Sequence, residues 1–224
     1  MKHVLCVGLA AVLCMCMAAV AAAEEQKPAA PPAEKSAQPA EEGFVPLFNG
    51  HDLTGWEGDT KLWTVENGML VGRSPGIKYN DFLATKKTYG DFILRYQIRL
   101  VDGKGNTGVQ FRSARVPNSS EVAGYQADYA SGWWGKLYDE ARRKKVLAGP
   151  SNEEGLKIVK PGDWNDYEVQ AAGNKITLTV NGTKTVEYTE TDANIAKTGV
   201  IATQIHGGGP MEVQFKNIRI KELK

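Results

Sequence analysis

Strict alternation of apolar and polar residues limits the folds open to this chain more than any other feature. Across Phe92–Leu100 the even positions are all apolar and most odd positions are polar, which is the pattern of a half-buried β-strand. Asn67-Gly68 separates two further strand-like runs, Trp63–Glu66 and Met69–Val71. Because Asn-Gly between strand-like runs is the strongest short signal for a β-hairpin, the chain is predicted to turn back on itself there.

The same pattern recurs to the end of the chain, with Asn181-Gly182 as a second hairpin turn. No long stretch has a helical period, and Ser151–Val159 is expected to hold one turn of helix at most. About a dozen strands without helical crossovers predict antiparallel sheets packed face to face. The strand count exceeds that of an immunoglobulin-like sandwich, so we predict an all-β, two-sheet antiparallel jelly roll of the concanavalin A-like lectin and glucanase type. Further strands are predicted at Val45–Phe48, Phe82–Thr85, Gly108–Ser113, Gly124–Tyr129, Lys136–Asp139, Tyr167–Ala171, Ile176–Val180, Thr185–Tyr188, Val200–Ile205 and Val213–Ile220, the last with a change of face near Asn217.

The first 42 residues differ from the rest. A basic start, an uninterrupted apolar run over Val4–Val20 and the small residues Ala21–Ala23 predict a cleaved signal peptide at 1–23. Residues 24–42 contain four prolines and no large apolar side chain, which predicts a disordered linker. The globular domain is expected at 43–224, exported to the periplasm or the medium. All three cysteines precede the predicted cleavage site, so the mature domain is expected to lack disulfides and thiolate chemistry.

The net charge and the motifs of the sequence exclude several classes of function. Without Lys2 the 26 basic and 26 acidic residues balance, so neither nucleic acid nor, after signal cleavage, a membrane surface is an expected partner. Walker, dinucleotide, G-x-S-x-G and H-E-x-x-H motifs are missing from the sequence. The mature domain has two histidines, His51 and His206, so no histidine-based metal cage is expected. An oxygen-ligated divalent cation such as calcium stays open.

Polar residues of an uncommon type for strands recur at alternate positions in three predicted strands. Strand parity places them on one face, where they could form a polar floor. A solvated sheet face would be the plainer explanation for each residue alone. As a set, short polar side chains that bond in several directions suit the hydroxyl groups of a sugar. The three pairs are Gln110 with Arg112, Gln126 with Asp128, and Gln204 with His206.

The segment after Asp128 adds aromatic and charged side chains. Trp133 and Trp134 lie in a glycine-flanked loop and could stack on a sugar ring, although one of the two is expected to cap the core instead. Tyr138 and Glu140 follow in the next predicted strand, and Glu140 or Asp139 could act with Asp128 as a carboxylate pair. Arg143 could bind a carboxylate or carbonyl oxygen, or lie exposed in the hairpin.

Several segments resemble the 3-keto-disaccharide hydrolase domain family, in order along the whole globular domain. They are FVPLFNGHDLTGWEG (Phe44–Gly58), WTVENGMLVG (Trp63–Gly72), YGDFILRYQIRL (Tyr89–Leu100), GNTGVQFR (Gly105–Arg112), GYQADY (Gly124–Tyr129), WNDYEVQAAGNKITLTVNG (Trp164–Gly182) and VQFKNIRIKEL (Val213–Leu223). Gln204-Ile205-His206-Gly207 matches the family's Gln-x-His-Gly. Many members read Glu-x-Gln where this chain has Gln126-Ala127-Asp128, which moves the carboxylate two positions along the same face.

The resemblance implies a concanavalin-like jelly roll and cleavage of a glycoside that has been oxidised to a ketone at C3. A base would remove the acidified C2 proton, the enolate would expel the C1 substituent, and water would add. Asp128 or His206 is the expected base, Glu140 an alternative acid or base, and Arg112 and Gln110 are expected to stabilise the oxyanion or hold hydroxyls. The predicted substrate-binding residues are Asn106, Gln110, Arg112, Gln126, Trp133, Trp134, Tyr138, Arg143 and Gln204. A non-catalytic carbohydrate-binding module and a surface interaction domain remain as alternatives.

Overall fold

The computed structural model of the protein describes Met1 and residues 41–224. The predicted signal peptide, apart from Met1, and most of the predicted linker lie outside the described residues. No helix within 41–224 is long and apolar enough to cross a membrane.

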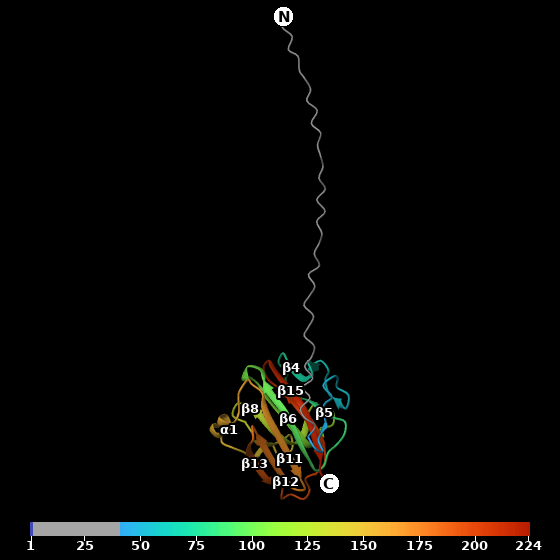
Figure 1. Cartoon of the computed structure of the whole chain (residues 1–224), viewed down its shortest axis with the longest axis vertical. Helices are drawn as coiled ribbons and strands as arrows, with labels where there is room; N and C mark the ends of the chain where they lie inside the picture. Colours follow the sequence, from blue (N-terminus) through green and yellow to red (C-terminus); the bar gives the residue numbers. More distant parts are fainter. Residues whose placement is uncertain (2–40) are drawn as a thin grey trace. The chain divides into compact units, whose positions relative to one another are not determined.

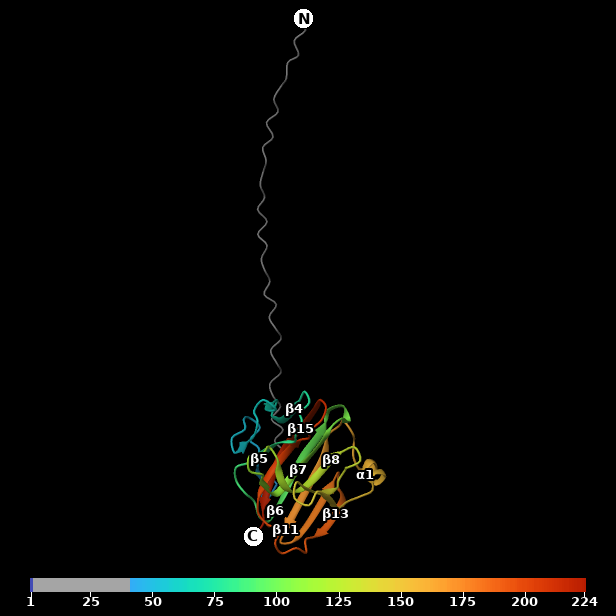
Figure 2. The same cartoon turned by 180° about the vertical axis from the view of Figure 1, so that it is seen from behind.

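Two antiparallel sheets form the domain (Figures 1 and 2). Sheet A has the order β13-β12-β11-β6-β15-β4-β3, with β1 paired to β15, and sheet B has the order β10-β9-β8-β7-β14-β5-β2. The predicted two-sheet jelly roll is therefore confirmed. The strands of sheet A are β1 (Val45–Pro46), β3 (Trp63–Glu66), β4 (Met69–Ser74), β6 (Phe92–Leu100), β11 (Asn165–Ala172), β12 (Lys175–Val180), β13 (Thr183–Thr189) and β15 (Met211–Glu222). Those of sheet B are β2 (Trp56–Glu57), β5 (Asp81–Thr85), β7 (Asn106–Arg115), β8 (Val122–Ala130), β9 (Leu137–Glu140), β10 (Lys145–Ala148) and β14 (Val200–Ile205).

Both predicted Asn-Gly hairpins are present. Asn67 and Gly68 have φ of 50° and 76°, and Asn181 and Gly182 have φ of 49° and 79°. Two consecutive positive φ angles are what a type I′ turn requires, and Asn and Gly adopt them at least cost. The turns fix the registers of β3 with β4 and of β12 with β13.

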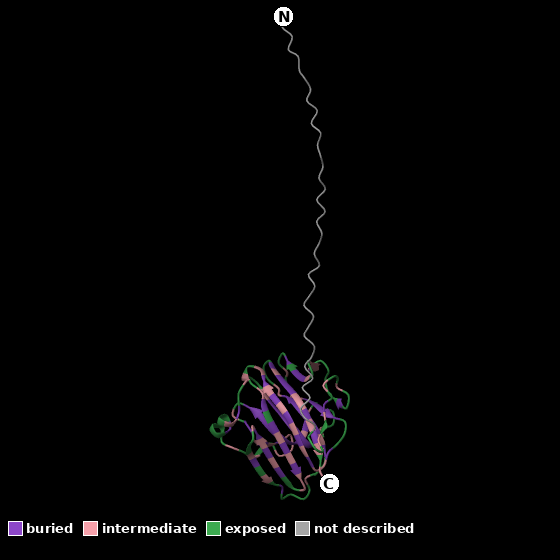
Figure 3. Cartoon of the chain, in the orientation of Figure 1, coloured by how far each residue is buried: buried purple, intermediate pink, exposed green. Residues whose placement is uncertain are grey.

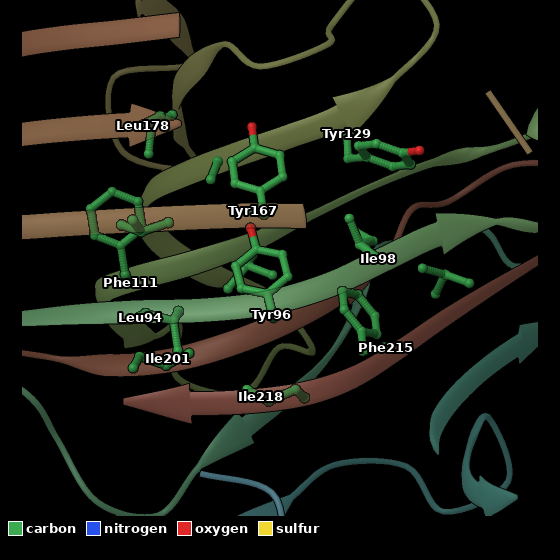
Figure 4. Close-up of a cluster of buried hydrophobic side chains, with 14 of the residues drawn as sticks. Leu94, Tyr96, Ile98, Phe111, Tyr129, Tyr167, Leu178, Ile201, Phe215 and Ile218 are labelled. Carbon is green, nitrogen blue, oxygen red and sulfur yellow. The ribbon is translucent and has the colours of Figure 1, made fainter. Parts of the chain in front are cut away.

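The main core lies between the sheets. Buried and partly exposed residues alternate strictly along β6, and the same banding marks the face of sheet A in Figure 3. Tyr96 of β6 stacks on Tyr167 of β11 at a ring separation of 5.2 Å, and Phe215 of β15 lies beside Tyr96 (Figure 4). The period-two pattern of the sequence is thus the inside-outside pattern of this sheet.

Two local features differ from the prediction, and a third agrees with it. Helix α1 (Asn152–Ile158) has seven residues rather than one turn, because Ser151 and Glu154 form a reciprocal capping box that satisfies its first backbone N–H groups. The short strands β2 and β10 were not predicted, since runs of two and four residues carry too little periodicity. The predicted change of face near Asn217 is confirmed by a register shift in β15, with Asn217 at φ 54°.

The central strands of sheet B, which are β5, β7, β8 and β14, are buried on both faces, and this positions the candidate site. Its inner face contributes Val109, Phe111, Tyr125 and Ala127 to the main core. Its outer face carries a second apolar cluster of Phe82, Ala84, Val122 and Ala202. Gln110 and Gln126, on the same face, are almost fully buried.

Candidate functional site

A row of residues crosses the outer face of sheet B. Strand pairing sets Ala202 opposite Gln110, Gln110 opposite Gln126, and Gln126 opposite Tyr138. Directly paired residues of neighbouring strands point to the same side. Asp128, two residues beyond Gln126 on β8, therefore shares this face. Gln110 of β7, Gln126 and Asp128 of β8 and Gln204 of β14 do come together as predicted, although Arg112 does not join them and the face is buried rather than solvated.

A pocket of about 140 Å³ opens on this face. It brings together residues from β7, β8, β9, the loop before β9 and the segment after β14. Each of them was predicted as a site residue from the sequence. They are Asn106, Gln126, Asp128, Trp133, Tyr138, Glu140 and His206.

Three glutamine side chains form a hydrogen-bonded chain beneath the pocket. Gln110 Nε2 donates to the Val122 carbonyl at 2.9 Å and to Gln126 Oε1 at 3.2 Å. Gln126 Nε2 donates to Asp128 Oδ1 at 2.7 Å and to Gln204 Oε1 at 3.1 Å. Gln110 and Gln204 are fully buried and do not line the pocket. They support Gln126 from behind, so the structure does not place Gln110 where it could hold a hydroxyl.

Buried polar atoms without a hydrogen-bonding partner gather at this pocket. Among the described residues they include Asn106 Oδ1, Asp128 Oδ2 and Gln204 Nε2. Natural proteins satisfy nearly all buried polar atoms, so a cluster of atoms without a partner in the protein indicates a place that accepts a polar ligand or water. Asn106 and Asp128 line the pocket directly, which makes it a candidate site for a polar ligand.

Asp128 has the most perturbed carboxyl group of the pocket. Burial raises its pKa from 3.8 to about 8; the hydrogen bond from Gln126 opposes this shift, and the charge of Glu140 adds to it. Burial also raises the pKa of Glu140, with the charge of Glu121 adding to the shift and His206 opposing it. A carboxyl group that exchanges its proton near neutral pH is suited to general acid–base catalysis.

The His206 ring has a defined orientation at the pocket wall. Its Nδ1 lies 2.6 Å from the Gly207 carbonyl oxygen. Because a carbonyl oxygen only accepts, Nδ1 carries the hydrogen and Nε2 is the acceptor of the neutral ring. The His206 backbone N–H donates to the Asn106 carbonyl, and Asn80 Oδ1 accepts from the Gly207 N–H. The segment around His206 is therefore held on both sides.

The two adjacent tryptophans have separate roles in packing. Trp133 is 37% exposed, lines the pocket and packs edge-to-face on Tyr138 at a ring separation of 5.5 Å. Lys136 Nζ lies 5.6 Å from the Trp133 ring centre. Trp134 is 3% exposed and packs on Tyr129 in the main core. The expectation that one tryptophan caps the core is confirmed for Trp134, which is therefore not placed to bind a substrate.

Arg112 does not join the polar row, which corrects the sequence prediction. A register shift follows Phe111, and Arg112 itself has φ of 47°. This β-bulge turns the side chain to the end of the sandwich. There its guanidinium bonds the Gly90 and Gly173 carbonyl oxygens and the Asp91 carboxylate.

Arg143 also lies away from the pocket. It pairs with Asp139 and with Glu190, so the carboxylates it reaches belong to the protein. A larger cavity of about 310 Å³ lies near Arg112, Tyr125 and Glu190. Its charged groups bond one another, because Arg143 and the Tyr125 hydroxyl both donate to Glu190. Unlike those of the smaller pocket, its lining residues contribute none of the buried, unpartnered polar atoms found within residues 41–224.

Sequence reasoning missed two contributors to the site. Gly108 lies opposite Asp128 on β7, and a Cβ atom there would lie 2.7 Å from Gln126 Cγ. Because Gly108 has no side chain, the Gln126 side chain can occupy the space above it on the outer face of β7. A glycine inside a strand next to polar pairs was the available signal. Lys136, close to Trp133, also acts on Asp128, since its charge opposes the rise in the Asp128 pKa.

No cluster of three or more His, Cys, Asp or Glu side chains able to hold a metal occurs within the described part of the chain. The expectation that calcium could bind through oxygen ligands is not tested by this observation, since backbone and amide oxygens also bind calcium.

Residues 43–221 match the family model of the 3-keto-alpha-glucoside-1,2-lyase-like domain. The chain belongs to this family. The match covers nearly all of the described residues and includes every residue of the pocket. No curated protein matches the chain.

Solved structures similar to this 3-keto-alpha-glucoside-1,2-lyase-like domain share its fold. A protein of Parabacteroides distasonis described as a glycosyl hydrolase is 22% identical, with 82% of this chain and 95% of that chain covered at a TM-score of 0.63. The carbohydrate-binding module CBM66 of Bacillus subtilis is 17% identical, with coverages of 75% and 96% and a TM-score of 0.57. The β-glucanase of Bacillus licheniformis is 12% identical, with coverages of 81% and 97% and a TM-score of 0.52. At these identities the likenesses show a shared fold, and the family match is what identifies the chain as a 3-keto-alpha-glucoside-1,2-lyase-like domain.

Proposed function

We propose that the protein cleaves 3-keto-glycosides by elimination at C1 and C2, followed by hydration. The observation that carries this proposal is the Asp128 carboxyl group, buried and with one unpartnered oxygen beside the pocket. Its pKa of about 8 leaves it able both to take and to give a proton near neutral pH. The family match over residues 43–221 supports the substrate class.

The reaction begins with proton abstraction. Asp128 takes the C2 proton, and the electrons of that C–H bond form a C2–C3 double bond while the C3 carbonyl oxygen becomes an enolate oxygen. Neutral donors that line the pocket stabilise this charge. The Asn106 amide is one. The Tyr138 hydroxyl is another, because burial together with the charges of Glu140 and Asp128 raises its pKa and keeps its proton in place.

Elimination follows. The enolate re-forms the C3 carbonyl, a C1–C2 double bond forms, and the C1–O bond breaks with its electrons on the leaving oxygen. Glu140 gives that oxygen a proton, a role that burial favours because it raises the pKa of Glu140. Water then adds across C1 and C2. His206, which lines the pocket with Nε2 as acceptor, takes a proton from the water as the water oxygen bonds to C1 and an enolate forms again. Asp128 returns to C2 the proton that it took in the first step, and the proton on His206 passes to Glu140, so that the free 3-keto sugar forms and each side chain regains its starting state.

Incubation of the purified domain with a 3-keto-disaccharide tests the proposal. Release of free sugar is expected, with no release from the unoxidised disaccharide, because without the ketone the C2 proton is not acidic. Asp128→Asn should reduce kcat by about 10²–10⁴-fold, the usual contribution of a general base. His206→Ala and Glu140→Gln should reduce it less if each serves only one later step. The assignment fails if the 3-keto-disaccharide stays intact, or if sugar release does not respond to these three substitutions.

A carbohydrate-binding module is the second candidate function. The exposed Trp133 at the pocket rim favours it, since an aromatic face commonly stacks on a sugar ring. The similar fold of the B. subtilis module fits this candidate as well. Such a module would retain an unmodified glycan and leave a 3-keto-disaccharide unchanged. Calorimetry with both sugars, followed by analysis of the recovered sugar, separates the two functions.

We also propose that the domain acts after export, as the apolar run and the small residues before Glu24 predict. The mature protein isolated from its host should then begin near Glu24. Detection of the unprocessed N-terminus in a protein that has stayed inside the cell would contradict export.

A further inference from the structure

We infer that Gln126 is a positioning residue: it holds Asp128 Oδ1 as a permanent hydrogen-bond acceptor, so that protons enter and leave the site only through Asp128 Oδ2. This inference rests on the proposed function and goes beyond it by assigning the atom that carries the proton and the side chain that selects it.

The orientation of the glutamine chain is set by a backbone carbonyl. Gln110 contacts the Val122 carbonyl oxygen, which can only accept, so the Gln110 group at this contact is its NH₂. The second hydrogen of that NH₂ points to Gln126, which must therefore present its oxygen to Gln110. A carbonyl on β8 thus fixes which end of the Gln126 amide faces Asp128.

Gln126 consequently presents its NH₂ to Asp128 and Gln204. One hydrogen goes to Asp128 Oδ1 and the other to Gln204 Oε1, so both are in use. Asp128 Oδ1 has to accept this bond whether the carboxyl group is ionised or neutral. In the neutral form the proton is therefore on Oδ2, the oxygen that has no partner within the described residues. The same atom accepts the proton when the group is ionised.

The hydrogen bond between Gln126 and Gln204 requires free space over the outer face of β7. Gln126 and Gln204 are separated by β7, and Gly108 is the β7 residue paired with Asp128. A Cβ atom at Gly108 would lie 2.7 Å from Gln126 Cγ and 3.0 Å from Gln126 Cδ. Contacts this short are not tolerated by packed side chains. Because Gly108 has no side chain, the Gln126 and Gln204 side chains can cross the outer face of β7 and form their hydrogen bond.

Nuclear magnetic resonance on the wild-type protein gives the first test. The Asp128 carboxyl carbon and the Gln126 side-chain NH₂ should titrate together with one midpoint, because the amide bonds the carboxyl group directly. Gln126 NH₂ resonances that stay constant while Asp128 titrates would overturn the inference. This readout needs no substrate, so it remains informative even if the proposed reaction fails.

The variant Gln126→Met gives the second test, since methionine fills a similar volume without a donor. The hydrogen bond from Gln126 lowers the Asp128 pKa, so its loss should raise that pKa by about one unit, the equivalent of a hydrogen bond to a charged group. The acidic limb of the pH profile of kcat/KM should shift to higher pH by the same amount as the Asp128 pKa. A merely structural role would lower activity at all pH values and leave the limb in place, and that result would overturn the inference.

Gln204→Leu is the matched control. Gln204 is as buried as Gln126 and bonds the same NH₂, but it does not contact Asp128. In Gln204→Leu the acidic limb of the kcat/KM profile should therefore stay at the same pH as in the wild type, even if the maximum value of kcat/KM changes. An equal shift in both variants would show that general loosening of sheet B, rather than the bond to Oδ1, sets the proton position.

Discussion

At the scale of single residues, burial separates side chains that look equivalent in the sequence. Gln126 and Asp128 read as a polar row that a solvated strand could carry, yet both are almost fully buried. Removal from water, not a neighbouring charge, is the largest cause of the raised Asp128 pKa. The adjacent tryptophans differ in the same way, because Trp134 fills the core and Trp133 meets the pocket.

Alanine substitution should separate the two tryptophans. Trp133→Ala removes one face of the pocket and should raise KM, or Kd for a bound sugar, by up to about tenfold, the equivalent of one stacking contact. Its thermal midpoint should hardly change. Trp134→Ala leaves a cavity in the core and should lower the free energy of unfolding by about 3–5 kcal/mol. Calorimetry and sugar titration check both; an unaltered affinity in Trp133→Ala would exclude this ring from the site.

At the scale of elements, a single bulge in β7 decides what its polar residues do. Before the register shift, Gln110 faces outward and supports the site. After it, Arg112 leaves that face and joins β7 to the segments around Gly90 and Gly173. Strict period-two reasoning places both residues on one side, so it fails where the backbone gains a residue.

Arg112→Ala should therefore act on stability rather than on sugar binding. It removes the donor to two part-buried carbonyl oxygens and one of the donors to Asp91, and the expected loss in the free energy of unfolding is about 3 kcal/mol. Arg115→Ala on the same strand is the control, because its exposed pair with Glu57 contributes less than about 1 kcal/mol. Denaturant unfolding gives both values. If Arg112→Ala instead folds with normal stability and loses sugar affinity, Arg112 takes part in sugar binding and the structural role is wrong.

At the scale of the whole molecule, two buried carboxyl groups give stability an optimum in pH. Burial alone would raise the pKa of Glu190, but hydrogen bonds from Arg143 and Tyr125 lower it to about 2. The stability that Glu190 contributes is complete above its unfolded pKa of 4.5 and is lost as the pH falls through about 2. Asp128 has the opposite sign: its contribution is complete below the unfolded value of 3.8 and is lost as the pH rises through about 8.

The thermal midpoint of the wild type should thus peak near pH 4–5 and fall on both sides. Asp128→Asn mimics the neutral carboxyl group, since its amide oxygen can still accept from Gln126. The variant should reduce the decline between pH 5 and 9, and at pH 9 it should exceed the wild type by on the order of a few kcal/mol. Glu190→Gln should instead flatten the acidic side. Parallel curves for the wild type and Asp128→Asn would show that Asp128 is not held protonated by burial.

The sequence by itself determined the features that depend on neighbours along the chain. Alternation gave the strands, Asn-Gly pairs gave the hairpins, and strand parity put Asp128 and Gln126 on one face, because these depend on backbone geometry and a period of two. Only the tertiary structure decided which polar residues lie together. Glu140 and His206 line the pocket beside Asp128, and Gln110 lies beneath the pocket. Arg112 instead bonds the Asp91 carboxylate, away from the pocket. The reason is physical. Pairing between distant strands, a one-residue bulge and the covering of the outer face set burial and hydrogen bonding, and none of these leaves a periodic trace in the sequence.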